Sequence, residues 1–120
     1  IVSCATLATE PLIAGEWLRP GVHVDLVGAF KPTMREADVA VLARARVFVD
    51  TPKAFEEAGE IVHALAAGAL TREAIAEDLF GLCRGGEGRR SDGEITLFKS
   101  VGTALEDLAA AALVWRRLTG

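Results

Sequence analysis

The chain has 120 residues, enough for one domain or part of one, with no room for a second core. Its 17 acidic and 13 basic residues give a net charge of −4, which argues against a nucleic-acid-binding protein, because such proteins usually carry a basic excess. Apolar residues make up 51% of the chain, which excludes intrinsic disorder and predicts that part of its surface packs against further protein.

Four short apolar segments predict β-strands. Residues 1–5, 23–28 and 47–50 are rich in β-branched side chains and lack strict polar alternation, which is typical of strands covered on both faces. Residues 95–98 form the fourth strand. Because helical patterns lie between the strands, the sequence predicts an α/β fold with a mostly parallel sheet.

Two helices are expected in the first half of the chain. Thr33 and Glu36 have the spacing of a capping box, which predicts a helix that ends near residues 44–46, where arginines suit a helix C-terminus. Thr51 followed by Pro52 predicts a second helix, with an N-cap and then proline at the first helical position.

Two more helices are expected in the second half. Thr71 is predicted to cap a helix that runs through Leu82 and stops at the glycines of residues 85–86. The last helix follows Gly102 and contains residues 108–115, which are apolar on every side. This helix is therefore expected to be buried or to lie at an interface.

The residues that follow the predicted strands are the functional candidates, because parallel α/β sheets bind ligands at the carboxyl ends of their strands. These candidates are residues 4–7, 27–30, 50–51 and 99–100. The acidic residues of segment 56–60 would usually form a solvated helix end. The alternative is a carboxylate that faces a cationic substrate.

The glycine cluster at residues 85–88 is not a nucleotide motif, because it follows a predicted helix rather than a strand. It is predicted to be a mobile basic loop. Arg84, Arg89 and Arg90 flank it, and the sequence does not decide whether they contact substrate, a partner subunit or only water.

The histidines and cysteines predict no metal site. His23 and His63 lack ligand partners at a suitable spacing, and Cys4 and Cys83 lie far apart in the sequence. Reduced thiols are expected, which favours a cytoplasmic protein. No apolar run approaches the roughly 18 residues of a membrane span, so no membrane partner is expected.

A set of eight short motifs occurs in order along the chain. The motifs are ATLATEP (5–11), GEWLRPGVH (15–23), VGAF (27–30), MREAD (34–38), ARVFVD (45–50), EAGE (57–60), ITLFKSVG (95–102) and ALED (104–107). Together they strongly resemble the ornithine cyclodeaminase/mu-crystallin family.

The resemblance implies that the chain is the C-terminal part of a longer, homodimeric protein with a Rossmann domain for NAD(H) or NADP(H) and a separate substrate domain. Residues 1–120 would then be part of the nucleotide-binding domain, and residues 95–120 its closing strand and helix. The glycine-rich phosphate loop is expected upstream of Ile1. The isolated chain is therefore expected to be inactive.

The resemblance also implies site residues. The positions that resemble cofactor-lining residues are Ala5, Thr6, Leu7, Val27, Phe30 and Ser100. Among them, Val27 and Phe30 would lie beside the nicotinamide, with Ser100 near its carboxamide. Glu57 resembles a residue that faces the substrate pocket.

One position departs from part of the family. In the cyclodeaminases that convert ornithine to proline, an aspartate that assists the amine chemistry stands at the position of Phe30. A phenyl ring cannot accept a proton. The resemblance therefore favours the bacterial imine-reducing branch, in which NAD(P)H transfers hydride to the C=N carbon of a cyclic imino acid such as Δ1-pyrroline-2-carboxylate.

Two other functions stay open at this point. One is an ornithine cyclodeaminase, an ammonia lyase that recycles its bound NAD. The other is a mu-crystallin-like protein whose nucleotide-bound form holds a small aromatic ligand. The sequence does not decide between NAD and NADP.

Overall fold

The computed structural model describes residues 1–120 and contains one five-stranded sheet in the order β1-β2-β5-β3-β4. All neighbouring strands are parallel. This confirms the predicted α/β fold with a parallel sheet. The strands are β1 (Val2–Cys4), β2 (His23–Leu26), β3 (Arg46–Val49), β4 (Glu77–Asp78) and β5 (Thr96–Lys99).

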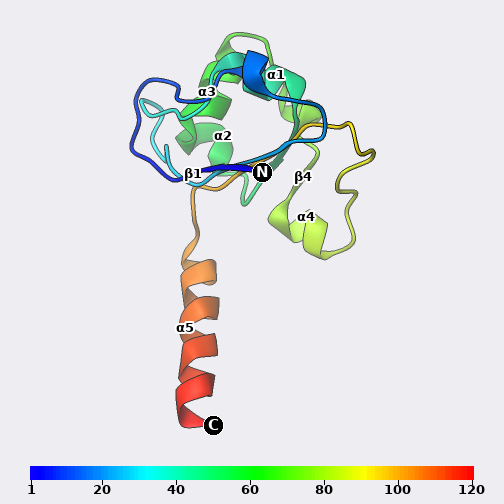
Figure 1. The fold of residues 1–120 in the computed structure, drawn as a ribbon. Coiled ribbons are helices and arrows are strands. Elements are labelled where there is room, and N and C mark those ends of the chain that lie inside the picture. The colour runs from blue at the N-terminus through cyan, green and yellow to red at the C-terminus, as the bar shows by residue number, and fades with distance from the viewer.

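The helices lie mainly on one side of the sheet. Figure 1 shows α1, α2 and α3 grouped together, whereas α5 extends away from the rest of the molecule. None of the helices combines the length and apolar character needed to cross a membrane. The α-helices are α1 (Val39–Arg44), α2 (Ala54–Glu57), α3 (Gly59–Ala66), α4 (Leu79–Cys83) and α5 (Ala104–Thr119), and the 3₁₀ turns are η1 (Gly15–Trp17) and η2 (Arg72–Ala74).

The core lies between the sheet and helices α1 to α3. Alternate residues of each strand point to this side, as the period of a β-strand requires. Their burial supplies the main favourable contribution to folding. The largest fully buried apolar side chains of this core are Val24, Leu26, Val47, Val49 and Leu97 from the strands and Val41, Leu42 and Ile61 from the helices.

The predicted capping box of Thr33 and Glu36 is wrong. Helix α1 begins at Val39, and its N-cap is Asp38, whose side chain accepts a hydrogen bond from the backbone N–H of Val41 at 3.0 Å. Glu36 is fully buried instead, because its carboxylate satisfies backbone groups of two other loops.

The second predicted helix begins later than the sequence indicated. Lys53, rather than Thr51, stands at the N-cap of α2, and the segment then divides into α2 and α3 at Ala58. The backbone carbonyl of Thr51 accepts a hydrogen bond from Ala54 at 3.1 Å, so Thr51 and Pro52 form the turn before the helix.

The third predicted helix, from Thr71 to Leu82, is wrong as a single element. The chain forms the turn η2, then the short strand β4, then α4. The backbone N–H of Ala76 donates to the carbonyl of Val47 at 2.8 Å, and β4 pairs with β3. Pairing with the edge of the sheet therefore overrides the local helical pattern.

The last helix forms as predicted after Gly102, with a capping box of Thr103 and Glu106. The expectation that it is buried is wrong for this chain, because Leu108 and Trp115 are exposed. Its packing at an interface stays a prediction.

A fully buried carboxylate joins the loops that follow β1 and β2. Oε1 of Glu36 accepts a hydrogen bond from the backbone N–H of Thr6, and Oε2 accepts one from Gly28 at 3.1 Å. A Cβ at Gly28 would collide with the backbone oxygen of Thr6. The next residue, Ala29, has a φ of 51°, in the left-handed region. The two loops thus approach backbone to backbone, and one side chain holds them together.

A buried ion pair lies next to this carboxylate. Nζ of Lys99 is 3.4 Å from Oε2 of Glu60 and also donates to the backbone oxygen of Gly28. Oε1 of Glu60 accepts a hydrogen bond from the backbone N–H of Glu36. Burial raises the pKa of Glu60, and the positive charge of Lys99 opposes that rise. We call Glu36, Glu60 and Lys99 the charge clamp.

We expect Lys99→Met to lower the free energy of unfolding by about 3–5 kcal/mol at neutral pH, because buried Glu60 loses its cation. Without that charge the pKa of Glu60 rises further. An acid whose pKa is raised by folding loses stability as the pH rises through that pKa, so the loss should be smaller at about pH 5 than at about pH 8. Urea unfolding followed by circular dichroism at both pH values measures this difference.

Two controls accompany this measurement. Lys53→Met removes an exposed lysine and should leave the free energy of unfolding nearly unchanged. The double variant Lys99→Met/Glu60→Gln should lose most of the added pH dependence, because it has no buried carboxyl group at residue 60. An equal loss at both pH values in Lys99→Met would contradict the role assigned to the ion pair.

Candidate functional site

Four strands end side by side and place one residue each in a single row. The backbone N–H groups of Val27, Ser100 and Asp50 donate to the last carbonyl of the neighbouring strand at 2.8, 3.0 and 3.1 Å. The parallel ladder therefore continues one step past the strands. The row, which we call the carboxyl edge, consists of Ala5, Val27, Ser100 and Asp50.

Large apolar side chains are exposed at the carboxyl edge and on the loops beside it. The exposed fractions are 67% for Leu7, 49% for Val27 and 44% for Phe30. The loops that carry them are in contact, because the backbone N–H of Ala29 donates to the carbonyl of Thr6 at 3.3 Å. Exposed apolar groups gathered at one place are typical of a ligand or protein contact.

A third buried carboxylate, Asp50, shapes the other half of the edge. Oδ2 of Asp50 accepts hydrogen bonds from Oγ of Ser100 at 3.0 Å and from the backbone N–H groups of Val101 and Gly102 at 2.8 and 2.7 Å. Its Oδ1 accepts one from the N–H of Thr51 at 2.7 Å. The turn between β5 and α5 therefore wraps around Asp50, which is fully buried. The sequence marked Asp50 only as a strand-end residue.

The carboxylates of segment 56–60 differ in environment. Glu57 lies at the end of α2 and is exposed, so its position facing a substrate pocket stays a prediction. Glu60 is buried in the charge clamp, which corrects the expectation of a wholly solvated helix end. Its neighbours Gly59 and Ile61 are buried with it, and these small and apolar neighbours were the only hint in the sequence. No group of three or more His, Cys, Asp or Glu side chains is placed to hold a metal ion.

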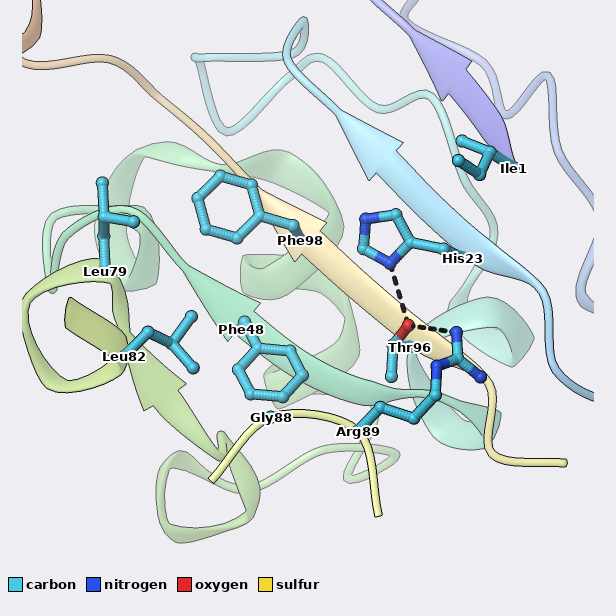
Figure 2. A pocket seen from close by; sticks show the side chains of 9 residues that line it. All are labelled: Ile1, His23, Phe48, Leu79, Leu82, Gly88, Arg89, Thr96 and Phe98. Carbon is cyan, nitrogen blue, oxygen red and sulfur yellow. Dashed lines mark hydrogen bonds between the residues drawn. The ribbon is translucent and has the colours of Figure 1, made fainter. Parts of the chain in front are cut away.

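A cavity of about 530 Å³ lies on the sheet face opposite the core (Figure 2). Phe48 and Phe98 line it together with His23, and Oγ1 of Thr96 lies 2.8 Å from Nδ1 of His23. Burial lowers the pKa of His23. His23 and Thr96 are the first residues of their strands, whereas Leu79 directly follows β4, so the cavity extends along this face of the sheet. None of Ala5, Val27, Ser100 and Asp50 lines it.

The arginines around the glycine loop have different surroundings. Arg89 donates to Oγ1 of Thr96 at 2.9 Å, and Arg90 forms an exposed ion pair with Glu94 at 2.7 Å. Arg84 is exposed. Arg89 and Arg90 thus hold the loop against the start of β5.

The chain matches proteins of known sequence and structure over all or nearly all of its length. Residues 1–120 match the model of the ornithine cyclodeaminase/mu-crystallin family. The chain is 49% identical over 122 residues to a Delta(1)-pyrroline-2-carboxylate reductase of Paracoccus denitrificans, with 100% of this chain and 39% of the relative covered. It thus spans about two fifths of that relative's length.

Two solved structures have the same fold. The Delta(1)-pyrroline-2-carboxylate reductase of Thermococcus litoralis, in complex with NADH and L-proline, superimposes with a TM-score of 0.90 at 34% identity, covering 95% of this chain and 36% of that one. An archaeal alanine dehydrogenase dimer with bound NAD gives a TM-score of 0.86 at 33% identity, covering 95% and 36%. With a family match over every residue, the chain belongs to the ornithine cyclodeaminase/mu-crystallin family.

Proposed function

We propose that the whole protein is an NAD(P)H-dependent reductase that converts a cyclic imino acid of the Δ1-pyrroline-2-carboxylate type to an amino acid such as proline. The observation that carries this proposal is the apolar surface of Leu7, Val27 and Phe30 beside the carboxyl edge, where Phe30 supplies no carboxylate. The Paracoccus relative and the Thermococcus complex with NADH and L-proline support it.

The carboxyl edge fits a nicotinamide ring. Leu7, Val27 and Phe30 expose apolar surface, and Ser100 adds one oriented hydroxyl group. NAD(P)H, when bound, supplies the hydride for imine reduction. The residues proposed to line the cofactor are Ala5, Thr6, Leu7, Val27, Phe30 and Ser100.

The chain's own contribution is to bind, orient and exclude water. The charge clamp holds the backbone of Thr6 and Gly28, so the apolar side chains of the two loops stay in fixed relative positions. Phe30 and Val27 would keep water from the reacting carbon. Phe30 has no proton to give, so the proton for the imine nitrogen comes from another group. Glu57 is proposed to face the substrate from α2.

We expect the whole protein to oxidise NADH or NADPH when Δ1-pyrroline-2-carboxylate is added, with one proline formed per nicotinamide oxidised. Absorbance of the reduced nicotinamide and amino-acid analysis measure the two quantities. Release of ammonia from L-ornithine without net change in the nicotinamide would contradict this function and would indicate a cyclodeaminase.

We also propose that the whole protein is a homodimer. The support is the apolar surface of α5, where Leu108 and Trp115 are 64% and 68% exposed, together with the dimeric alanine dehydrogenase of the same fold. Sedimentation equilibrium of the whole protein is expected to give twice the subunit mass. A subunit mass at the same micromolar concentrations would contradict the dimer.

A further inference from the structure

We propose that Asp50 is a positioning residue that makes Ser100 a hydrogen-bond acceptor for the –NH₂ group of the nicotinamide carboxamide. This role rests on the proposed function, because it requires the nicotinamide to lie at the carboxyl edge. Asp50 itself would touch no ligand and would act through the hydroxyl group of Ser100.

The direction of the Ser100–Asp50 hydrogen bond follows from the other partners of Asp50. Three backbone N–H groups, from Thr51, Val101 and Gly102, donate to its carboxylate at 2.7, 2.8 and 2.7 Å. An ionised carboxylate has acceptor atoms only. The hydroxyl group of Ser100, 3.0 Å from Oδ2, is therefore the donor.

The hydrogen bond to Asp50 determines which hydrogen-bonding groups of Ser100 remain free for a ligand. A serine hydroxyl carries one proton and two lone pairs, and its proton is directed to Asp50. The backbone N–H of Ser100 is also occupied, since it donates to the carbonyl of Leu26 at 3.0 Å. Ser100 thus presents lone pairs but no proton to a ligand at the edge.

A carboxamide has two different ends, an oxygen that accepts and a nitrogen that donates. An edge group that can only accept selects the nitrogen end. Ser100 is half-buried beside Val27 and directly follows the central strand β5, so a ring lying against Val27 would bring its carboxamide within reach. Ser100 would therefore help to determine the orientation of the carboxamide group.

The test measures binding to the whole protein by isothermal titration calorimetry, so it does not depend on turnover. The probes are NADH or NADPH, its acetylpyridine analogue, which has no –NH₂ group, and its thionicotinamide analogue, which keeps that group. The variants are Ser100→Ala, Asp50→Asn and the matched control Ser91→Ala, which removes an exposed hydroxyl group from the glycine loop.

We expect Ser100→Ala to raise the Kd for the natural and thionicotinamide cofactors by about two- to tenfold, the worth of one hydrogen bond. The Kd for the acetylpyridine analogue should stay unchanged, so the preference for an –NH₂ group disappears. Asp50→Asn should reduce the same preference, because its amide no longer forces the hydroxyl group to donate. Ser91→Ala should change none of the three values.

The outcomes separate this proposal from the proposed function. If all three probes bind but Ser100→Ala weakens them equally, or weakens none, the acceptor role is wrong while the function stands. If none of the probes binds the wild-type protein, both are wrong. If Asp50→Asn does not fold, the three Kd values for Ser100→Ala still decide whether Ser100 accepts from –NH₂.

Discussion

Two backbone N–H groups on neighbouring loops share one buried carboxylate, and the shape of the carboxyl edge depends on that contact. Glu36 reaches Thr6 and Gly28 from a third segment, and Lys99 binds the carbonyl of the same glycine. Without such partners, buried backbone groups would cost about 1–3 kcal/mol each. Buried side chains thus hold the two loops that carry the exposed apolar side chains, and the outer surface of these loops stays free for a ligand.

Burying three charged side chains in a small domain is costly unless each one is paired. Here Lys99 is paired with Glu60, and the carboxylates of Glu36 and Glu60 accept hydrogen bonds from backbone N–H groups. A third buried carboxylate, Asp50, accepts hydrogen bonds from backbone N–H groups of the turn after β5. Polar groups below the sheet edge therefore determine its geometry, whereas the groups that face outward are mostly apolar. An edge with apolar groups outward and polar groups buried is better suited to binding a flat, uncharged ring than to acid–base catalysis.

The sequence predicted most of the sheet, because short apolar runs such as residues 47–49 mark buried strands in the sequence itself. It did not predict β4, since Glu77 and Asp78 are charged and form a strand only through pairing with β3. The role of Glu36 was also hidden, because its spacing from Thr33 matches a capping box, and its true partners Thr6 and Gly28 lie in two loops that only the fold brings together. The contacts of Asp50 required knowing that β3 and β5 are adjacent.

The most direct test of this account is a crystal structure of the whole protein with reduced nicotinamide cofactor bound. We predict the ring against Val27, with its carboxamide nitrogen at a hydrogen-bond distance of about 2.7–3.2 Å from Oγ of Ser100. A ring bound away from the row of Ala5, Val27 and Ser100, with that row covered by other side chains, would contradict the account.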